Sequence, residues 1–240
     1  MKYQINNEFI TPDIIRKLKL IKSGKTGKVY KWKNNKILKI FSNNPPNNRC
    51  PMDLETADIL SKINIESRYI ILPIDLVFNK NDYEKKNLKG YTSQNINKKG
   101  NKKENKSITK MSKRDLIENI KRIEDDIELL SSKNILLDGL NTENTIFNGY
   151  LYISDPTNYI KIEEESVRNI NMNLFQQLLI DLITRDLRKL NVPRTKIEQL
   201  AELLYLKDDE VLNSIYLKDI LDTPTYIDDI DNILTLTKKI

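Results

Sequence analysis

Three polar residues with side-chain oxygens suited to a metal ion lie within one stretch, Leu136 to Pro156, of this 240-residue chain. They are Asp138, Asn144 and Asp155, and short apolar runs typical of strands stand between them. Asn148-Gly149 predicts a turn between two of these strands. The hairpin would carry Asn144 at the entrance of one strand and Asp155 at the exit of the other. Because Mg²⁺ prefers one or two protein oxygens together with substrate phosphates, the stretch predicts a magnesium site.

The same residues also have a purely structural interpretation. Asn and Asp next to strands most often bond their own backbone in turns. For this stretch taken alone, that interpretation is the better one. The balance changes because a second group of residues, with phosphate-binding chemistry, lies upstream.

This second group is a glycine loop between two strands, within Leu18 to Phe41. Gly24 and Gly27 flank the loop, and Asn34-Asn35 then turns the chain into a strand that contains Lys39. Glycines at a strand-to-strand turn let backbone amides approach phosphate oxygens closely, because no Cβ stands in the way. The pattern therefore favours binding of a phosphorylated ligand.

In this order the residues resemble the motifs of the protein-kinase-like superfamily, and the chain looks like a small, divergent bacterial member. In that family a G-x-G-x-x-G-x-V loop covers ATP, a strand lysine holds the phosphates, a helix glutamate pairs with that lysine, and an Asn and an Asp hold the metal ions. The resemblance assigns Gly24, Gly27 and Val29 to the loop, Lys39 to the strand lysine, Glu55 to the helix glutamate, and Asn144 and Asp155 to the metal. Without the family pattern, Glu55 would be interpreted as a solvated charge of its helix.

The chain also departs from the family pattern. Lys22 stands where the first glycine is expected, and Asp138 lies six residues before the metal-binding Asn, whereas the family has its catalytic Asp five before, at the place of Gly139. Either the loop holds one extra residue and Asp138 is the base, or the base is missing. The chain has no histidine and so no H-R-D motif, it has Pro156-Thr157 in place of Phe-Gly, and it has no A-P-E motif.

The resemblance implies an α+β, two-lobed protein-kinase-like fold. Residues 1–96 would form an N-terminal nucleotide-binding lobe, an antiparallel sheet of five strands with one helix, preceded by a short lead-in over residues 1–17. Residues 97–240 would form a mainly helical C-terminal lobe with the catalytic loop and the metal-binding Asp. Thr92 to Ile96 would be the hinge whose backbone bonds adenine, which makes Thr92 a cofactor-binding residue. Apolar patterns predict strands over 70–78 and 88–92, helices over 52–63 and 116–130, and further helices around 174–183, 197–204 and 212–221.

Composition excludes several classes of protein. The chain is 39% hydrophobic and 31% charged, without an apolar run as long as a membrane span, which predicts a globular protein with no membrane partner. The N-terminal residues lack the apolar core of a signal peptide, so a cytoplasmic location is expected. A single cysteine, Cys50, cannot form an internal disulfide, and the absence of histidine argues against a zinc site.

The positive charge is concentrated in one segment. Residues 80–114 contain twelve Lys or Arg against three Asp or Glu, a local charge of +9 that exceeds the +6 of the whole chain. Aromatic residues for base stacking are nearly absent there. We therefore expect a solvated loop, and nucleic acid or another polyanion as partner is the minority hypothesis.

Three functions follow from these patterns. The leading hypothesis is an ATP- and Mg²⁺-dependent phosphotransferase acting on an unidentified protein or small-molecule hydroxyl, with Lys39, Glu55 and Asp138 as its catalytic residues. The second is a pseudokinase, a nucleotide-binding or scaffold module without turnover. The third, a polyanion binder acting through residues 80–114, ranks last.

Overall fold

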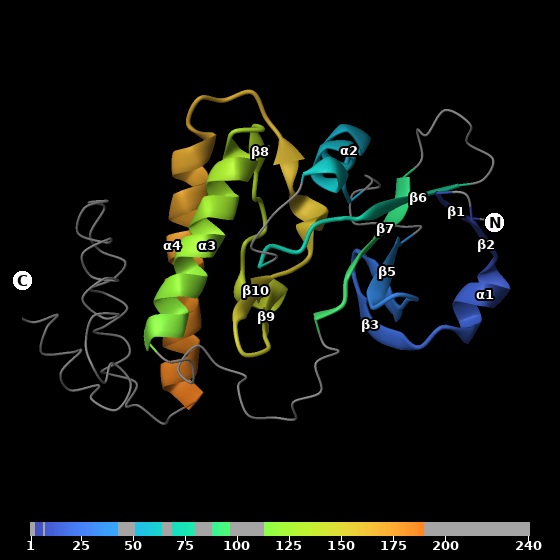
Figure 1. Ribbon diagram of the computed structural model, residues 1–240, viewed down its shortest axis with the longest axis horizontal. Helices are drawn as coiled ribbons and strands as arrows, with labels where there is room; N and C mark the ends of the chain where they lie inside the picture. Colours follow the sequence, from blue (N-terminus) through green and yellow to red (C-terminus); the bar gives the residue numbers. More distant parts are fainter. Residues whose placement is uncertain are drawn as a thin grey trace, which may run out of the picture.

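The computed structural model describes residues 3–6, 8–42, 51–63, 69–79, 88–96 and 113–189. They form a mixed α+β structure in which an antiparallel sheet lies beside a group of helices (Figure 1). The predicted α+β class is therefore confirmed. Cys50, most of the basic segment 80–114, and the helices predicted around 197–204 and 212–221 lie outside the described residues.

The sheet has seven strands in the described part of the chain, in the order β2-β1-β6-β7-β5-β4-β3. Five were expected, and the additional two form a hairpin within residues 1–17, which had been predicted as a lead-in. The predicted strand over 70–78 begins only at Asp75, because Ile70 instead makes a parallel bridge with Ile153. The strands are β1 (Tyr3–Ile5), β2 (Glu8–Ile10), β3 (Leu20–Gly24), β4 (Gly27–Lys31), β5 (Lys36–Phe41), β6 (Asp75–Asn79) and β7 (Leu88–Gln94).

The two faces of β5 bury different surfaces, because successive side chains of a strand point to opposite faces. Leu38 and its neighbours pack in a small core with β1 and β6, whereas Phe41 joins the main core on the other face. Lys39 shares the face of Phe41 and is nevertheless buried. The turn that leads into β5 has Asn34 and Asn35 at φ 53° and 60°, as the sequence predicts for a tight hairpin.

Gly90 allows the neighbouring strand to approach β5 next to Lys39. A Cβ at Gly90 would lie 1.9 Å from the carbonyl oxygen of Lys39, a distance no real Cβ adopts. Gly27 has the same role on the other side of β5, where a Cβ would lie 2.2 Å from the Ile40 carbonyl oxygen. Both glycines are thus needed for close packing of the strands around Lys39.

Four helices are described: α1 (Pro12–Lys17), α2 (Leu54–Lys62), α3 (Lys113–Ser131) and α4 (Val167–Lys189). The helices predicted over 52–63, 116–130 and 174–183 are confirmed as α2, α3 and α4. Asp53 caps α2 by accepting a hydrogen bond from the backbone N–H of Thr56 at 2.8 Å, which satisfies one free donor of the first turn. In Figure 1, α3 and α4 lie side by side, on the side of the described part away from strands β1 and β2.

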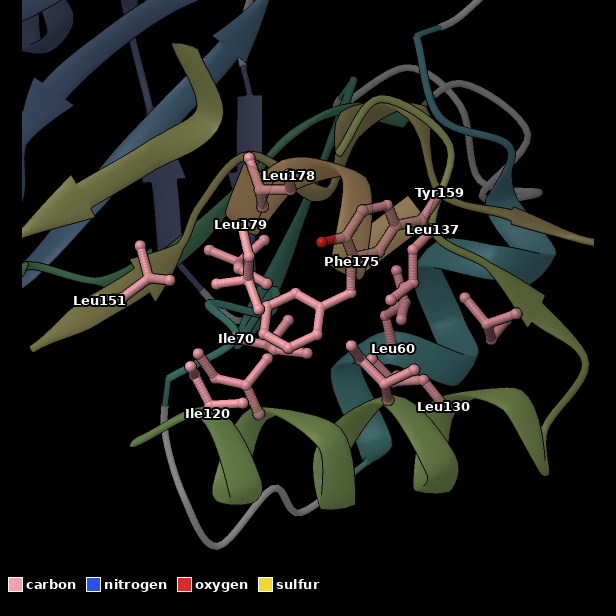
Figure 2. Packing of buried hydrophobic residues seen from close by; sticks show 14 of the residues in the cluster. Leu60, Ile70, Ile120, Leu130, Leu137, Leu151, Tyr159, Phe175, Leu178 and Leu179 are labelled. Carbon is pink, nitrogen blue, oxygen red and sulfur yellow. The ribbon is translucent and has the colours of Figure 1, made fainter. Parts of the chain in front are cut away.

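The main core joins α2, α3 and α4 to the strands that follow α3. Phe175 of α4 lies near its centre, between Ile120 and Leu130 of α3 on one side and Tyr159 on the other (Figure 2). Leu60 of α2 belongs to the same cluster. The helices and the segment after Asp155 therefore share one hydrophobic core.

Two buried asparagines connect the helices to the segment that carries Asp138, Asn144 and Asp155. Asn119 of α3 accepts from the Leu151 N–H at 2.7 Å and donates to the Leu151 carbonyl at 3.2 Å. Asn171 of α4 accepts from the Leu137 N–H at 2.8 Å and donates to the Ile135 carbonyl at 2.8 Å. Because neither amide is exposed to water, these bonds fix the backbone on both sides of the site.

Short elements shape this segment: β8 (Ile135–Leu136), the 3₁₀ turn η4 (Thr142–Asn144), β9 (Thr145–Phe147), β10 (Leu151–Ile153), the 3₁₀ turn η5 (Pro156–Asn158) and β11 (Ile160–Lys161). The pairing of β9 with β10 confirms the predicted hairpin around Asn148-Gly149. Of the helices described, none has both the length and the apolar character needed to cross a bilayer.

Candidate functional site

An ion pair between a buried lysine and a partly exposed aspartate joins the sheet to the segment after β10. Lys39 of β5 is 3% exposed, and its ammonium lies 2.5 Å from Asp155 Oδ1 and 2.6 Å from Thr157 Oγ1. The two charged residues are 116 positions apart in the sequence. Only the fold brings them together.

Asp155 has an unusual backbone conformation. It follows β10 with φ 64° and ψ 71°, in the left-handed region that residues other than glycine rarely adopt. Its Oδ1 accepts hydrogen bonds from Lys39, from the Thr157 hydroxyl, and from the Tyr91 hydroxyl at 3.3 Å. Such strain persists where surrounding contacts hold it, and it is frequent at functional sites.

Burial and the ion pair together shift the pKa values of Asp155, Lys39 and Tyr91. Burial alone would raise the pKa of Asp155, but the ammonium of Lys39 and the hydrogen bonds from Lys39 and Thr157 outweigh it and hold the pKa below the usual range. Burial lowers the pKa of Lys39, the charge of Asp155 opposes this, and Lys22 adds to the lowering. Burial followed by the Asp155 charge raises the pKa of Tyr91 far above its usual value, so its hydroxyl remains a donor.

Asn144 lies next to Asp155, at the place that the predicted hairpin gave it. Its carbonyl accepts from the Ser154 N–H at 2.7 Å, which fixes the entrance of β9 against the exit of β10. Its side-chain Nδ2 donates to the Gly139 carbonyl at 3.0 Å. The carboxamide oxygen is the end of this side chain that a cation would use.

The ion pair lies in a cleft of about 260 Å³ between the sheet and the β9–β10 hairpin. Apolar side chains from both sides line much of it, among them Ile21, Val29, Ile37, Ile71, Ile96 and Ile146. Its polar lining includes Lys22, Lys39, Glu143, Asn144 and Asp155. The cleft thus combines an apolar wall with two cations and two carboxylates.

A larger hollow, of about 450 Å³, lies on the other face of β4 and β5. Among the described residues, Arg16 and Lys28 are its charged lining residues and no carboxylate lines it. The described lining of this hollow therefore has no counterpart of the Lys39–Asp155 pair in the cleft.

Some predicted cofactor-binding residues do not reach the cleft. Gly24 and Gly27 line the larger hollow instead, and Gly27 serves the close approach of β4 to β5. The Thr92 side chain faces away because side chains alternate along β7, and its hydroxyl donates to Asp75 at 2.6 Å. The rest of the predicted hinge, residues 93–96, lines the cleft, as does Tyr91. The backbone contact of this hinge with adenine stays a prediction.

The predicted pair of Glu55 with Lys39 is corrected by the structure. Glu55 Oε1 accepts a hydrogen bond at 2.6 Å from Lys161, on the strand that follows Asp155, and the Glu55 side chain is 65% exposed. Asp155 is the carboxylate that faces Lys39. Glu55 thus connects α2 to β11 at the surface.

Asp138 is exposed in the turn after β8 and is not among the residues that line the cleft. Gly139 next to it has φ 82°, so the chain does turn there through a conformation that suits glycine. A Cβ at Gly139 would lie 2.7 Å from Asn158 Nδ2. Glu143 is the carboxylate that joins Asn144 and Asp155 along the cleft.

Three residues of the site had no role in the sequence-based prediction. Tyr91 is directly opposite Lys39 in the β5–β7 pairing, a relation that only the strand register reveals. Thr157 bridges Lys39 and Asp155, and its signal was its place two residues after the predicted metal ligand. Lys22 was noted only as a departure from the glycine motif, yet it lines the cleft.

No model of a known protein family matches the chain, and a comparison with functionally characterised proteins gives no match either. The chemistry of the cleft is therefore the basis for a functional assignment.

Proposed function

We propose that this protein is an ATP- and Mg²⁺-dependent phosphotransferase with a two-lobed, kinase-like organisation, in which the cleft around Lys39 takes the nucleotide. The observation that carries the proposal is the ion pair between the buried Lys39 and Asp155. A lysine ammonium is a phosphate ligand, an aspartate is a magnesium ligand, and the pair stands at the junction of sheet and hairpin. The left-handed backbone of Asp155 adds support, because uncommon backbone conformations cluster at functional sites.

The lining of the cleft fits the parts of the proposed ligand. The isoleucines and Val29 offer an apolar wall for an aromatic base. Asn144 and Asp155 would hold the metal with one amide oxygen and one carboxylate, since Mg²⁺ keeps water and phosphate as its other ligands. When bound, the metal would neutralise developing charge on the transferred phosphoryl group.

Lys39 would have to exchange partners when the ligand enters. In the structure its ammonium is occupied by Asp155 and Thr157, and the cleft volume of about 260 Å³ is just under the ~300–1,000 Å³ typical of small-molecule sites. Separation of Lys39 from Asp155 would free the ammonium for phosphate oxygens and the carboxylate for the metal. Phosphoryl transfer depends mainly on such positioning and charge neutralisation.

A second candidate function is a pseudokinase that binds nucleotide without turnover. It is favoured by the place of Asp138, which is exposed and outside the lining of the cleft. A general base must come within hydrogen-bond reach of the acceptor hydroxyl, although such contacts are often long before substrate binds. Asp138 therefore decides between the two candidates.

The test is ATP hydrolysis and autophosphorylation by wild type, Asp138→Ala, Glu143→Ala and Asp155→Asn. The enzyme proposal expects wild-type turnover, a loss of at least about a hundredfold in Asp138→Ala with ATP binding retained, and loss of Mg²⁺-dependent turnover in Asp155→Asn. If Glu143→Ala alone abolishes turnover, the base has been assigned to the wrong carboxylate. Wild type that binds Mg·ATP and is inert in both assays supports the pseudokinase.

A further inference from the structure

An irregularity in the first cleft-forming strand determines which face Lys22 occupies. Leu20 pairs with Tyr30, but Lys22 rather than Ile21 pairs with Val29, so β3 holds one extra residue at Ile21. Such a bulge re-aims the side chains that follow it. Without it, Lys22 would lie opposite Lys28, on the far face of the sheet.

The bulge brings Lys22 into a row of side chains that crosses the sheet. Lys22 is opposite Val29, Val29 is opposite Lys39, and Lys39 is opposite Tyr91. All four line the cleft. Since neighbouring strands are about 4.8 Å apart, the backbones of Lys22 and Lys39 are separated by roughly 10 Å, within the joint reach of two lysine side chains.

The two lysines differ in exposure and in partners. Lys39 is buried and paired with Asp155, whereas Lys22 is exposed and has no carboxylate partner among the described residues. Because Asp155 already compensates the charge of Lys39, Lys22 is the lysine of the cleft whose charge an anionic ligand can compensate.

We propose that Lys22 is a second phosphate-binding residue, which together with Lys39 clamps the polyphosphate chain of the ligand and makes the cleft selective for nucleoside triphosphates over monophosphates. The inference rests on the proposed nucleotide function and extends it. Lys39 lies deeper and serves the inner phosphates. Lys22, at the exposed edge, serves the outer ones, so its contribution depends on the length of the phosphate chain.

The experiment measures the dissociation constants of ATP, AMP and inorganic tripolyphosphate, each with Mg²⁺, by isothermal titration calorimetry. The variants are Lys22→Met, Lys22→Arg and the matched control Lys28→Met. Lys28 is a lysine of the adjacent strand whose side chain lies on the opposite face of the sheet and lines the larger hollow. Circular dichroism verifies that each variant is folded, as expected for an exposed side chain.

Lys22→Met is expected to raise the dissociation constants of ATP and tripolyphosphate about tenfold, the usual effect of losing one charge-assisted contact at a partly exposed site. The dissociation constant of AMP should change less than twofold. Lys22→Arg should retain most of the affinity for ATP, and Lys28→Met should bind ATP as wild type does. The loss should shrink at high salt, because exposed charges are screened.

Three results would overturn the clamp. If Lys22→Met and Lys28→Met change the affinity for ATP equally, the clamp is wrong and the nucleotide proposal stands. The same holds if Lys22→Met weakens the binding of ATP and AMP equally. Wild type that binds neither ATP nor tripolyphosphate removes both proposals. If tripolyphosphate binding depends on Lys22 and ATP binds no more tightly than tripolyphosphate, the result supports the clamp and contradicts the proposal that the ligand is a nucleotide.

Discussion

Asp155→Asn is expected to destabilise the protein more than Lys39→Met, although each removes one member of the same ion pair. The reason is unequal burial, since the lysine side chain is 4% exposed and the aspartate 32%. Asp155→Asn keeps an amide oxygen as acceptor but removes the negative charge, which leaves a buried ammonium without a compensating charge. Removing the ammonium leaves a carboxylate that water reaches and that still accepts from Thr157 and Tyr91.

The magnitudes follow from this asymmetry. Breaking a fully buried pair from one side costs about 3–5 kcal/mol, and partial access of water to the position of Asp155 reduces this to about 2 kcal/mol. Lys39→Met replaces a buried charge by an apolar side chain of similar length and should cost about 1 kcal/mol or less. Asn is suited to the left-handed backbone at position 155, so the substitution adds no backbone strain.

Urea unfolding of both single variants and the double variant, followed by circular dichroism, measures these differences as a double-mutant cycle. The double variant should be more stable than Asp155→Asn alone, because it no longer buries an unpaired ammonium. Equal losses in the two single variants, with simple additivity in the double, would refute the account of the pair.

Three further outcomes are expected. Gly90→Ala should lower the free energy of unfolding in urea by more than about 2 kcal/mol, because its Cβ would meet the Lys39 carbonyl oxygen at 1.9 Å. Gly149→Ala, which has open space around it, should cost about 1 kcal/mol for its positive φ alone. Similar losses in the two variants would contradict the packing argument. Asn171→Ala should lower the free energy of unfolding by about 2–3 kcal/mol and speed hydrogen exchange of the backbone after α3, because the buried N–H of Leu137 loses its acceptor. Unchanged exchange would show that the Asn171 amide is dispensable. The depressed pKa of Asp155 contributes stability that is fully present above pH ~4, near the pKa of the unfolded chain, and that is lost as the pH falls through the lower pKa of the folded protein. The difference in unfolding free energy between wild type and Asp155→Asn should therefore shrink below pH ~4. A constant difference down to about pH 2 would exclude this linkage.

Local features of the chain could be predicted because they depend on neighbours in sequence. The Asn34-Asn35 and Asn148-Gly149 turns follow from residues that tolerate positive φ, and α2, α3 and α4 follow from apolar periodicity. The hairpin that sets Asn144 beside the exit of β10 belongs to the same class. In each case a short segment contains its own signal.

Features that depend on register or on distant contacts could not be predicted. The β1–β2 hairpin has strands of three residues, too short for an alternating pattern to stand out. The direction in which Thr92 faces requires the register of β7, and the position of Lys22 requires the bulge at Ile21. The resemblance assigns Glu55 as the partner of Lys39, and only the tertiary structure brings Asp155, 116 positions along the chain, against the ammonium instead.

The central claim is that the cleft around Lys39 binds the phosphates of ATP, and affinity labelling with an acyl phosphate of ATP tests it most directly. The probe transfers its acyl group to a lysine amine beside the bound phosphates, and peptide mass spectrometry then locates the modified residue. The account predicts acylation of Lys39 or Lys22 that Mg·ATP suppresses at lower concentration than AMP does. Labelling confined to other surface lysines, or labelling of Lys39 and Lys22 that Mg·ATP does not suppress, would contradict it.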